Sequence, residues 1–509
     1  MQRIIYFGPP GTGKTFTLLE HLEAALRGGV PPSRIAFLTF TRRARAEAIE
    51  RVERALGIMP DELPYFRTIH SMCYRALRLQ EGDVMGRAAL AEFGTLMGLE
   101  FGTTAASEQA AEGLWSQAKG DHLLAIDTLA RLRYDSPLEV WREARSPYDR
   151  VVLEQFCRSY RLFKEERGLL DFTDVLQQYV DAGPVLPVDV VFVDEAQDLS
   201  SLQWSAALRA SSEAAEQYIA GDDDQAVYKW AGAEVEVLQN LSGTRRILSQ
   251  SHRLPRRVHA HAIKILDRIK TRIPKEFAPR DADGAVRRHP SADALSVQKE
   301  DRWLWLVRNR YTMNALREQL LAAGHVVAHH GASSIVESER RDIYAWERLR
   351  AGKPLDVAAA RDVYARLRAR VQIKHGHKLI PKAADDALLT LQDLRRDHGL
   401  LIAEDAPWYD VFTSIPLERR AYYRRLLRLH NSLRIAPQVT LETIHGAKGA
   451  QADKVALFLE QSRRTYEEAQ RAPDEEHRVW YVGATRAREE LHVIQGAGRY
   501  QYPLPIVTT

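Results

Sequence analysis

A strand, a glycine-rich loop and a helix follow one another at the N-terminus of the chain, and this order constrains the fold more than any other feature. The apolar stretch RIIYF is followed by GPPGTGKT and then by FTLLEHLEAAL, whose apolar residues recur at helical spacing. A strand that leads through such a loop into a helix is the context in which a phosphate-binding P-loop works. We therefore predict an α/β fold with a parallel sheet and a nucleotide site at its edge.

Each residue type in this loop has a task in holding a nucleotide. The glycines let backbone N–H groups wrap phosphates at a helix N-terminus. Lys14 is expected to reach the β- and γ-phosphates and so to take part in catalysis, and Thr15 is expected to offer its hydroxyl to Mg²⁺. The predicted nucleotide contacts in this segment are Gly8, Pro9, Pro10, Gly11, Thr12, Gly13, Lys14, Thr15 and Phe16.

A second predicted strand ends in two carboxylates. The segment VDVVFVDEAQDLS contains a β-forming run that is interrupted only by Asp189 and ends in Asp194 and Glu195. Buried parallel strands deliver their terminal acids to the edge of the sheet where ligands bind. We expect Asp194 to hold Mg²⁺ through water and Glu195 to polarise the attacking water as a catalytic residue. The chain is thus predicted to be at least an ATPase that uses ATP and Mg²⁺.

Length and charge bound the rest of the molecule. A chain of 509 residues is too long for one ordinary core, so several domains are expected. The net charge of +4 does not by itself indicate a nucleic-acid partner. Two segments, 361–380 and 416–434, are locally basic, and each is either a phosphate-facing surface or a solvated helix face.

Cysteine usage and hydropathy indicate the compartment. Only Cys73 and Cys157 occur, and their spacing fits neither a disulfide framework nor a structural zinc site. No stretch approaches about 18 uninterrupted apolar residues, and no cleavage site follows the N-terminal apolar run. We expect a cytoplasmic protein with no signal peptide and no membrane span.

One short loop, GDDDQAVYKWAGA from Gly221 to Ala233, joins three aspartates and a glutamine to a Tyr-Lys-Trp cluster. The acids suit a cation or phosphate site, whereas Tyr228 and Trp230 are large amphipathic rings that seek burial or a flat partner. Taken alone, the loop is more simply an acidic turn that leads into the core. The remainder of the chain has to decide between these interpretations.

Eight segments in a fixed order give the chain a resemblance to the superfamily 1 UvrD/Rep-like helicases. In chain order they are GPPGTGKT, FLTFTRRARAE, RTIHSMCYRAL, VFVDEAQDLS, GDDDQAVYKWAGA, LSQSHRLP, VTLETIHGAKGAQAD and RVWYVGATRAREEL. The resemblance implies two RecA-like P-loop NTPase motor domains with parallel sheets, each carrying a mainly helical insertion. It also implies that ATP binds between the two domains and that single-stranded DNA runs across both.

The resemblance implies roles for residues outside the P-loop. Gln225 corresponds to the γ-phosphate sensor, and Arg253 and Arg486 correspond to catalytic arginines that approach that phosphate from the second motor domain. Tyr228 and Trp230 correspond to base-stacking residues, since an aromatic face stacks on any base at about 1–3 kcal/mol. The loop would then couple ATP to DNA. The other implied DNA contacts are Phe40, Thr41, His70 and His445, although a purely structural role for His70 and His445 is an equal alternative.

The chain departs from the family pattern at several places. Only seven residues precede Gly8, so the upstream glutamine segment that recognises adenine is missing and adenine selectivity stays open. His252 stands where a base-stacking tyrosine is usual, and Gln451 where a glutamate is usual; both are predicted nucleotide contacts. Ala231 replaces an arginine.

The gaps between the motifs predict the domain layout. We expect the first motor domain over 1–75 and 176–246, with a helical insertion over 76–175. The second motor domain is expected over 247–335 and 436–509, with a basic, duplex-facing helical insertion over 336–435.

Two functions are consistent with these residues. The first is an ATP-dependent DNA helicase that translocates on single-stranded DNA and unwinds duplex, with 3′-to-5′ polarity implied by the resemblance alone. The second is a non-unwinding translocase or regulator that uses ATP to displace bound proteins from nucleic acid. The expected partners are single-stranded DNA, single/double-strand junctions, and replication or repair proteins, with no membrane contact and a monomeric or weakly self-associating state.

Overall fold

The computed structural model describes residues 1–40, 42–102, 116, 118–298, 300–377, 380 and 387–504. The chain divides into two compact units. Unit 1 consists chiefly of Met1–Val286 and Arg463–Glu490, and unit 2 of Arg287–Ser462 and Leu491–Pro503.

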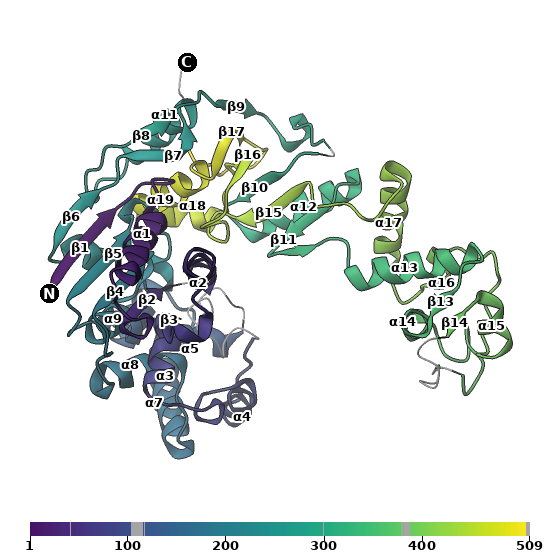
Figure 1. The fold of residues 1–509 in the computed structure, drawn as a ribbon, viewed down its shortest axis with the longest axis horizontal. Helices are drawn as coiled ribbons and strands as arrows, with labels where there is room; N and C mark the ends of the chain where they lie inside the picture. The colour runs from purple at the N-terminus through teal and green to yellow at the C-terminus, as the bar shows by residue number, and fades with distance from the viewer. Residues whose placement is uncertain are drawn as a thin grey trace. The chain divides into compact units, whose positions relative to one another are not determined.

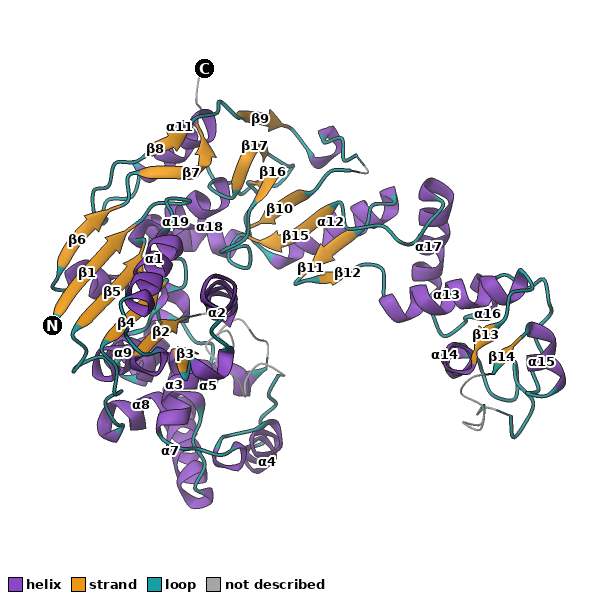
Figure 2. Ribbon diagram, in the orientation of Figure 1, coloured by secondary structure: helices purple, strands orange, loops and turns teal. Residues whose placement is uncertain are grey.

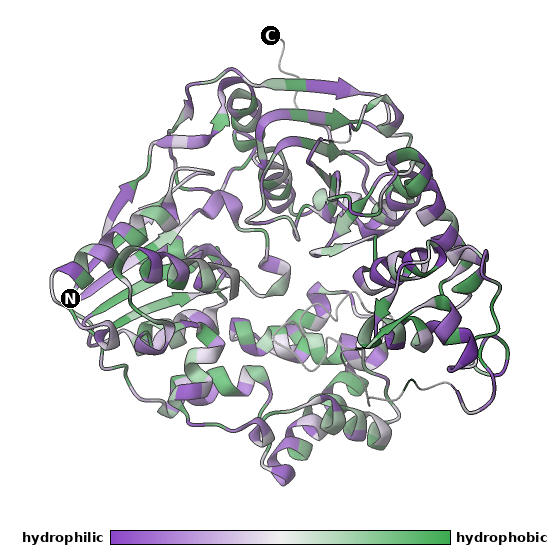
Figure 3. Cartoon of the chain, turned by 45° about the vertical axis from the view of Figure 1, so that its right-hand side comes forward, coloured by the Kyte–Doolittle hydropathy of each residue, from purple (hydrophilic) through white to green (hydrophobic). Residues whose placement is uncertain are grey.

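A six-stranded parallel sheet forms the centre of unit 1 (Figure 1). Its order is β3-β2-β4-β5-β1-β6. The strands are β1 (Gln2–Phe7), β2 (Ile35–Thr39), β3 (Tyr65–Thr68), β4 (Val190–Asp194), β5 (Glu216–Gly221) and β6 (Thr244–Ile247). Figure 3 colours the middle strands of this sheet largely as hydrophobic, as expected of strands covered on both faces.

Helices cover both faces of this sheet because side chains of each strand alternate between two cores. Ile4 and Tyr6 join the core under α1 and α2, whereas Ile5 and Phe7 join the core formed with α3, α8, α9 and α10. These helices are α1 (Lys14–Arg27), α2 (Arg42–Leu56), α3 (Ile69–Ala76), α8 (Phe172–Ala182), α9 (Ser201–Ala210) and α10 (Val235–Asn240).

A group of helices between α3 and α8 has a core of its own (Figure 2). The group consists of α4 (Arg87–Met97), α5 (Lys119–Arg133), α6 (Pro137–Glu143) and α7 (Arg150–Arg167). At its centre the ring of Phe93 lies 5.2 to 5.7 Å from the rings of Phe156, Tyr160 and Phe163. The mainly helical insertion expected in this part of the chain is therefore present.

Unit 1 extends beyond the first sheet. It also contains β7 (Gln250–Pro255), α11 (Arg256–Leu266), β8 (Ala278–Arg280), α18 (Arg463–Ala469) and α19 (Pro473–Ala484). The sequence placed the start of the second motor domain at 247, whereas the compact unit that holds the P-loop continues to Val286. β7 makes hydrogen bonds to the P-loop itself, as described below, and the second motor domain expected from 247 stays a prediction.

Unit 2 is built on a second sheet, whose order is β12-β11-β15-β10-β16-β17-β9. The inner pairings of β10 with β15 and β16, and of β11 with β15, are parallel, and β12 is antiparallel to β11. The strands are β9 (Ala285–His289), β10 (Trp303–Val307), β11 (Val327–His329), β12 (Ala332–Ser333), β15 (Val439–Thr443), β16 (Ala452–Phe458) and β17 (Ala487–Ile494), and α12 (Arg310–Ala323) packs on the sheet.

A second, mainly helical group lies between β12 and β15 and also has its own core, which includes Trp346, Tyr364, Phe412 and Tyr423. Its elements are α13 (Glu337–Arg350), β13 (Leu355–Asp356), α14 (Val357–Arg366), β14 (Leu388–Leu389), α15 (Leu391–Arg396), α16 (Trp408–Val411) and α17 (Leu417–His430). No helix in the described part of the chain is long and apolar enough to span a bilayer.

Candidate active site

The P-loop joins β1 to α1 and is shaped by two glycines with left-handed backbone. Gly11 has φ +75° and Gly13, the residue before α1, has φ +85°. A Cβ atom on Gly11 would lie 2.3 Å from the Cβ of Arg253, so only glycine permits this close approach. The Lys14 ammonium donates to the Gly8 carbonyl at 2.6 Å, and the Thr12 hydroxyl braces the loop through the Pro9 carbonyl at 2.8 Å.

Two hard oxygen ligands lie side by side next to this loop. The Thr15 hydroxyl donates to Asp194 Oδ2 at 2.7 Å, and the Asp194 side chain is fully buried at the end of β4. Burial, together with the charge of Glu195, raises the pKa of Asp194 to about 6. A hydroxyl and a buried carboxylate fit the oxygen preference of Mg²⁺.

Glu195 occupies a strained position directly after β4. Its φ is +51°, in the left-handed region that costs a non-glycine residue about 1 kcal/mol or more. The Glu195 N–H donates to Asp194 Oδ1 at 2.9 Å, and Gln197 Nε2 donates to Glu195 Oε2 at 2.5 Å. These contacts hold the carboxylate predicted to activate water.

A chain of hydrogen bonds, which we call the relay, connects Glu195 to Arg486. Gln197 also accepts the Asp222 N–H at 3.0 Å through Oε1. Gln225 Nε2 donates to Asp222 Oδ2 at 2.7 Å, and Arg486 Nη2 donates to Gln225 Oε1 at 2.8 Å. Every residue between Glu195 and Arg486 in the relay is buried, so its polar groups are held in one arrangement.

The two predicted γ-phosphate arginines lie within reach of each other's charge, and Arg486 is buried whereas Arg253 is half-buried. Burial and the charge of Arg253 lower the pKa of Arg486 to about 9. Burial also lowers the pKa of Arg253, whose Nε has no hydrogen-bond partner among the described residues. The buried Arg486 and the half-buried Arg253, whose Nε donor is unused, place two positive charges together, and the Glu195 carboxylate acts on both. A polyphosphate supplies further negative charge, so the residues present fit ATP.

Both arginines belong to the unit that holds the P-loop. The Ser251 hydroxyl on β7 donates to the Pro10 carbonyl at 2.8 Å, and the His252 N–H donates to the Gly11 carbonyl at 2.9 Å. Arg253 is therefore placed by direct contact of β7 with the loop. The sequence had placed it across a domain boundary.

The three aspartates of the Gly221–Ala233 loop serve a structural task that the sequence did not reveal. The buried ammonium of Lys275 lies 3.3 Å from Asp222 Oδ1 and 2.8 Å from Asp224 Oδ2, and it also contacts Asp223. Arg272 makes two 2.8 Å hydrogen bonds to the Asp224 carboxylate. The cluster thus binds side-chain cations, which occupy the position that a metal ion would take. Three buried carboxylates require cations, but the sequence does not identify partners about fifty residues away.

Helix α19 is tied to the same turn. Arg478 Nε donates to the Asp223 carbonyl at 2.9 Å. Because Arg486 follows the end of α19, this contact sets the position of its guanidinium relative to Gln225. Arg478 begins the segment RVWYVGATRAREEL, but no role was predicted for it from the sequence.

The predicted stacking residues form an aromatic row that is only half-buried. The ring centroids of Phe40 and Tyr228 are 5.9 Å apart, and those of Tyr228 and Trp230 are 6.2 Å apart. His70 is also half-buried and meets the ring of Phe172 edge-on. Partial exposure is what a base-stacking platform requires. Thr41 lies outside the described residues.

The remaining predicted contacts are dispersed. Phe16 is exposed beside the P-loop, with the Arg51 guanidinium 4.4 Å from its ring centre, and the side chain of His252 is exposed. Gln451 and His445 belong to unit 2, where Gln451 is exposed. Burial and the charges of Arg308 and Lys448 hold the pKa of His445 well below its usual range, so its imidazole is neutral. The ligand contacts of these four residues stay predictions.

Two family models match the chain. The model described as the UvrD/REP helicase N-terminal domain matches residues 2–245, and the UvrD-like helicase C-terminal domain matches residues 425–497. The first match includes the P-loop, Glu195 and Gln225, and the second includes His445 and Arg486.

Several relatives are named as helicases. The ATP-dependent DNA helicase PcrA of Bacillus subtilis (strain 168) is 23% identical over 600 aligned residues, which cover 95% of this chain and 79% of that protein. PcrA of Staphylococcus aureus (strain Mu50 / ATCC 700699) is 23% identical over 54% of this chain and 39% of its own. A probable DNA helicase II homolog of Mycoplasma capricolum subsp. capricolum is 24% identical over 54% of this chain and 40% of its own. The arterivirus nonstructural protein 10 helicase structure aligns with 97% of this chain and 59% of its own, but at 11% identity and a TM-score of 0.34 it is too distant to indicate a shared fold.

The two family matches and the parallel sheets indicate the same fold and the same family. The α/β fold with two RecA-like domains and mainly helical insertions, which was expected from the sequence, is confirmed. The chain is an ATP-hydrolysing enzyme, and it belongs to the UvrD/Rep-like superfamily 1 DNA helicases.

Proposed function

We propose that the chain is an ATP-driven motor that translocates on single-stranded DNA in the 3′-to-5′ direction and unwinds duplex. The observation that carries the proposal is the relay from Glu195 to Arg486, because Gln225, which lies within it, begins the segment that leads to Tyr228 and Trp230. The same short turn therefore serves the hydrolysis site and the aromatic row.

The chemistry assigned to the site follows from the position of each group. Thr15 and Asp194 would hold Mg²⁺, which supplies positive charge to the phosphate oxygens. Lys14 would exchange its hydrogen bond to the Gly8 carbonyl for the β- and γ-phosphates of ATP, and Arg253 would use its unpaired Nε–H on the same group. Glu195 would accept the proton of the attacking water and Gln225 would orient that water.

Coupling would arise from competition for Arg486. In the relay this guanidinium donates to Gln225. A phosphate oxygen is the stronger, charged acceptor, so Arg486 would release Gln225 when ATP binds. The 222–233 turn, with Tyr228 and Trp230, would then shift once in each hydrolysis cycle.

A second candidate function is a translocase that displaces bound proteins without unwinding. Residues 246–424, which include the helical group expected to face duplex, lie outside both family-model matches, although the alignment with PcrA covers 95% of this chain. Motor chemistry alone would be sufficient for protein displacement.

Two measurements on one preparation separate these functions. We expect single-stranded DNA to stimulate ATP hydrolysis more than duplex DNA or RNA does, and partial duplexes with a 3′ overhang to be opened faster than those with a 5′ overhang. Lys14→Ala, which lacks the phosphate ligand, and Glu195→Gln, which keeps a partner for Gln197 but cannot accept a proton, should be inactive in both. DNA-stimulated hydrolysis with no strand separation would instead support the second function, and hydrolysis unaffected by any nucleic acid would contradict both.

The expected partners other than DNA, the monomeric state and the cytoplasmic location stay predictions. Binding to single/double-strand junctions is part of the proposal, because a motor that unwinds must meet such a junction.

A further inference from the structure

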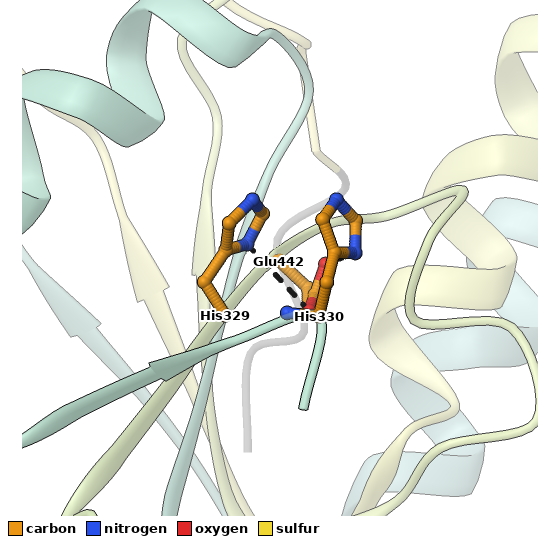
Figure 4. A group of neighbouring side chains, drawn as sticks. All are labelled: His329, His330 and Glu442. Carbon is orange, nitrogen blue, oxygen red and sulfur yellow. Dashed lines mark hydrogen bonds and ion pairs between the residues drawn. The ribbon is translucent and has the colours of Figure 1, made fainter. Parts of the chain in front are cut away.

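A cluster of two histidines and a glutamate lies in unit 2, within a single patch of the second sheet. His329 ends β11 and His330 follows in the turn to β12, whereas Glu442 lies on β15, the parallel neighbour of β11. One possible ligand atom from each residue lies within 4.8 Å of those of the other two. Figure 4 shows the two imidazole rings side by side next to the Glu442 carboxylate.

The backbone of the turn holds the histidines in place. His329 pairs with Ala332, so His330 and Gly331 form a two-residue hairpin loop with φ +47° and +78°. Loops of this kind favour asparagine and glycine, and a histidine with positive φ is uncommon. The His330 N–H donates to Glu442 Oε1 at 2.6 Å, which fixes the turn on the carboxylate.

The carboxylate is short of positive charge. The Glu442 side chain is 8% exposed, and among the described residues its ion pairs are with His330 Nδ1 at 3.2 Å and His329 Nδ1 at 3.6 Å. The geometry of the 3.2 Å contact does not make a hydrogen bond, so Oε2 lacks one although it is buried. A buried carboxylate with an unsatisfied oxygen is costly unless a cation joins it.

One histidine is held beside the carboxylate by a second contact. His329 Nδ1 lies 3.0 Å from the Leu441 carbonyl and 3.6 Å from Glu442 Oε1. Because a carbonyl can only accept, Nδ1 carries the proton here and the lone pair of His329 lies on Nε2, so the ring has to turn for Nε2 to share an ion with the carboxylate (Figure 4).

We propose that His329, His330 and Glu442 bind a divalent transition-metal ion of the Zn²⁺ class. Imidazole nitrogens favour such ions over Mg²⁺ and Ca²⁺, and three protein ligands plus water complete a tetrahedral zinc site. Ligand atoms about 2.1 Å from a tetrahedral ion are about 3.4 Å apart. In this cluster the possible ligand atoms are separated by up to 4.8 Å, so the more distant ones must approach one another when an ion binds. The side chains of His329 and His330 are 31% and 61% exposed, which leaves the rings room to rotate.

The site is distinct from the aspartate cluster of unit 1, whose centre is filled by Lys275. A bound ion would connect the β11–β12 turn to β15 three residues before His445. The inference concerns binding of the ion and does not depend on the proposed function.

The test uses metal-stripped full-length protein without nucleotide or DNA, with Co²⁺ as a visible probe and Mg²⁺ in excess to occupy oxygen-rich sites. We expect one Co²⁺ per chain with the absorption bands of low coordination number, displaced by Zn²⁺. Glu442→Gln keeps an acceptor for the His330 N–H, and His330→Asn tolerates positive φ, so both should fold and lose the bands. His375→Asn, at an exposed histidine elsewhere in unit 2, should keep them.

Either of two results would overturn the proposal, and the first needs only the wild-type protein. No low-coordinate Co²⁺ binding in excess Mg²⁺, or binding that survives in both Glu442→Gln and His330→Asn, would mean that Glu442 serves only to hold the turn. Circular dichroism of each variant identifies a loss of bands caused by misfolding, and in that case the wild-type result decides.

Discussion

Asp194 ends β4 and Glu195 follows it, and the buried Arg486 lies within reach of the charge of the half-buried Arg253. Like charges placed together cost folding free energy when no substrate is present. The chain supplies part of the counter-charge, since Glu195 acts on both arginines and Lys14 on Asp194, and Mg²⁺ and phosphate would supply the rest. Residues of this kind raise substrate affinity because binding relieves an unfavourable arrangement that already exists.

The first prediction concerns the pH dependence of Asp194. Its carboxyl has a pKa of about 6 when folded and an ordinary value of 3.8. Between these values the folded state holds more protons than the unfolded state, so without metal the free energy of unfolding should fall as pH rises from about 4 to 6, by about 3 kcal/mol. Denaturation in a chelator should show this slope in wild type and not in Asp194→Asn. The affinity for Mg²⁺ should change in the opposite sense and rise through pH about 6, and identical stability profiles for both proteins would contradict the assignment.

The second prediction concerns Arg253. Its truncation removes a half-buried side chain whose buried Nε is unpaired among the described residues, so Arg253→Ala should leave the melting temperature of the enzyme without substrate unchanged or higher. If the guanidinium acts on the γ-phosphate, kcat should nevertheless fall about 10³-fold, as with other arginine fingers. Arg256→Ala is the matched control, because it loses only exposed ion pairs with Asp281 and Asp283. A loss confined to ATP affinity, with kcat intact, would place Arg253 outside the transition state.

At the scale of elements, the 222–233 turn is held from several directions. Lys275 and Arg272 neutralise its aspartates, Arg478 ties it to α19, and Gln197 ties it to the end of β4. A turn held so firmly moves only if one of its contacts is exchanged. The hydrogen bond from Arg486 to Gln225 is the contact that ATP would replace.

The third prediction concerns Trp230 at the far end of this turn. Because its ring is half-buried, Trp230→Ala should cost clearly less stability than the ~3–5 kcal/mol of a core aromatic. Loss of a stacking surface should remove about 1–3 kcal/mol of single-strand binding. Unwinding should then fall by a larger factor than ATP hydrolysis at saturating DNA. Melting temperature, DNA titration and both rates on one preparation test this, and a large drop in melting temperature with parallel loss of every activity would mean that Trp230 is core.

At the scale of the whole molecule, chemistry and duplex contact are assigned to different units. Arg253 and Arg486, the predicted catalytic arginines, belong to unit 1, whereas the basic helix α17 belongs to unit 2. Arg419 and Arg420 on α17 are used internally, by Glu339 and by the Tyr409 carbonyl. Arg424, Arg425 and Arg428 are exposed.

The fourth prediction follows from this division. If α17 faces duplex phosphates, the double variant Arg425→Ala and Arg428→Ala should weaken junction binding and reduce the slope of log affinity against log salt by about 2. ATP hydrolysis on single-stranded DNA should be unchanged, because the catalytic groups lie in unit 1. Arg396→Ala, an exposed arginine paired with Asp393 and Asp397, is the control. An unchanged salt slope would mean that α17 is an ordinary solvated helix.

The motifs anticipated much of the active site because their tasks are local. The P-loop needs residues that adopt a left-handed backbone, and Gly11 and Gly13 supply them. A buried strand carries its acids at one end, as β4 does. The spacing of a few neighbouring residues is therefore enough to predict the loop and the acidic strand end. The contact between Thr15 and Asp194 joins residues 179 positions apart, yet it follows from the order of strands in a parallel sheet.

The amino-acid sequence by itself determined the fold class, the nucleotide loop, the acidic strand end and the loop that joins Gln225 to Trp230. Only the tertiary structure decided which unit holds Arg253 and Arg486, that Lys275 neutralises the three aspartates, and that His329 and His330 meet Glu442. The physical reason is that periodicity and loop chemistry depend on neighbours in the chain. The partner of a buried charge is instead whichever distant group the completed packing brings within a few ångströms, and no spacing rule encodes that choice.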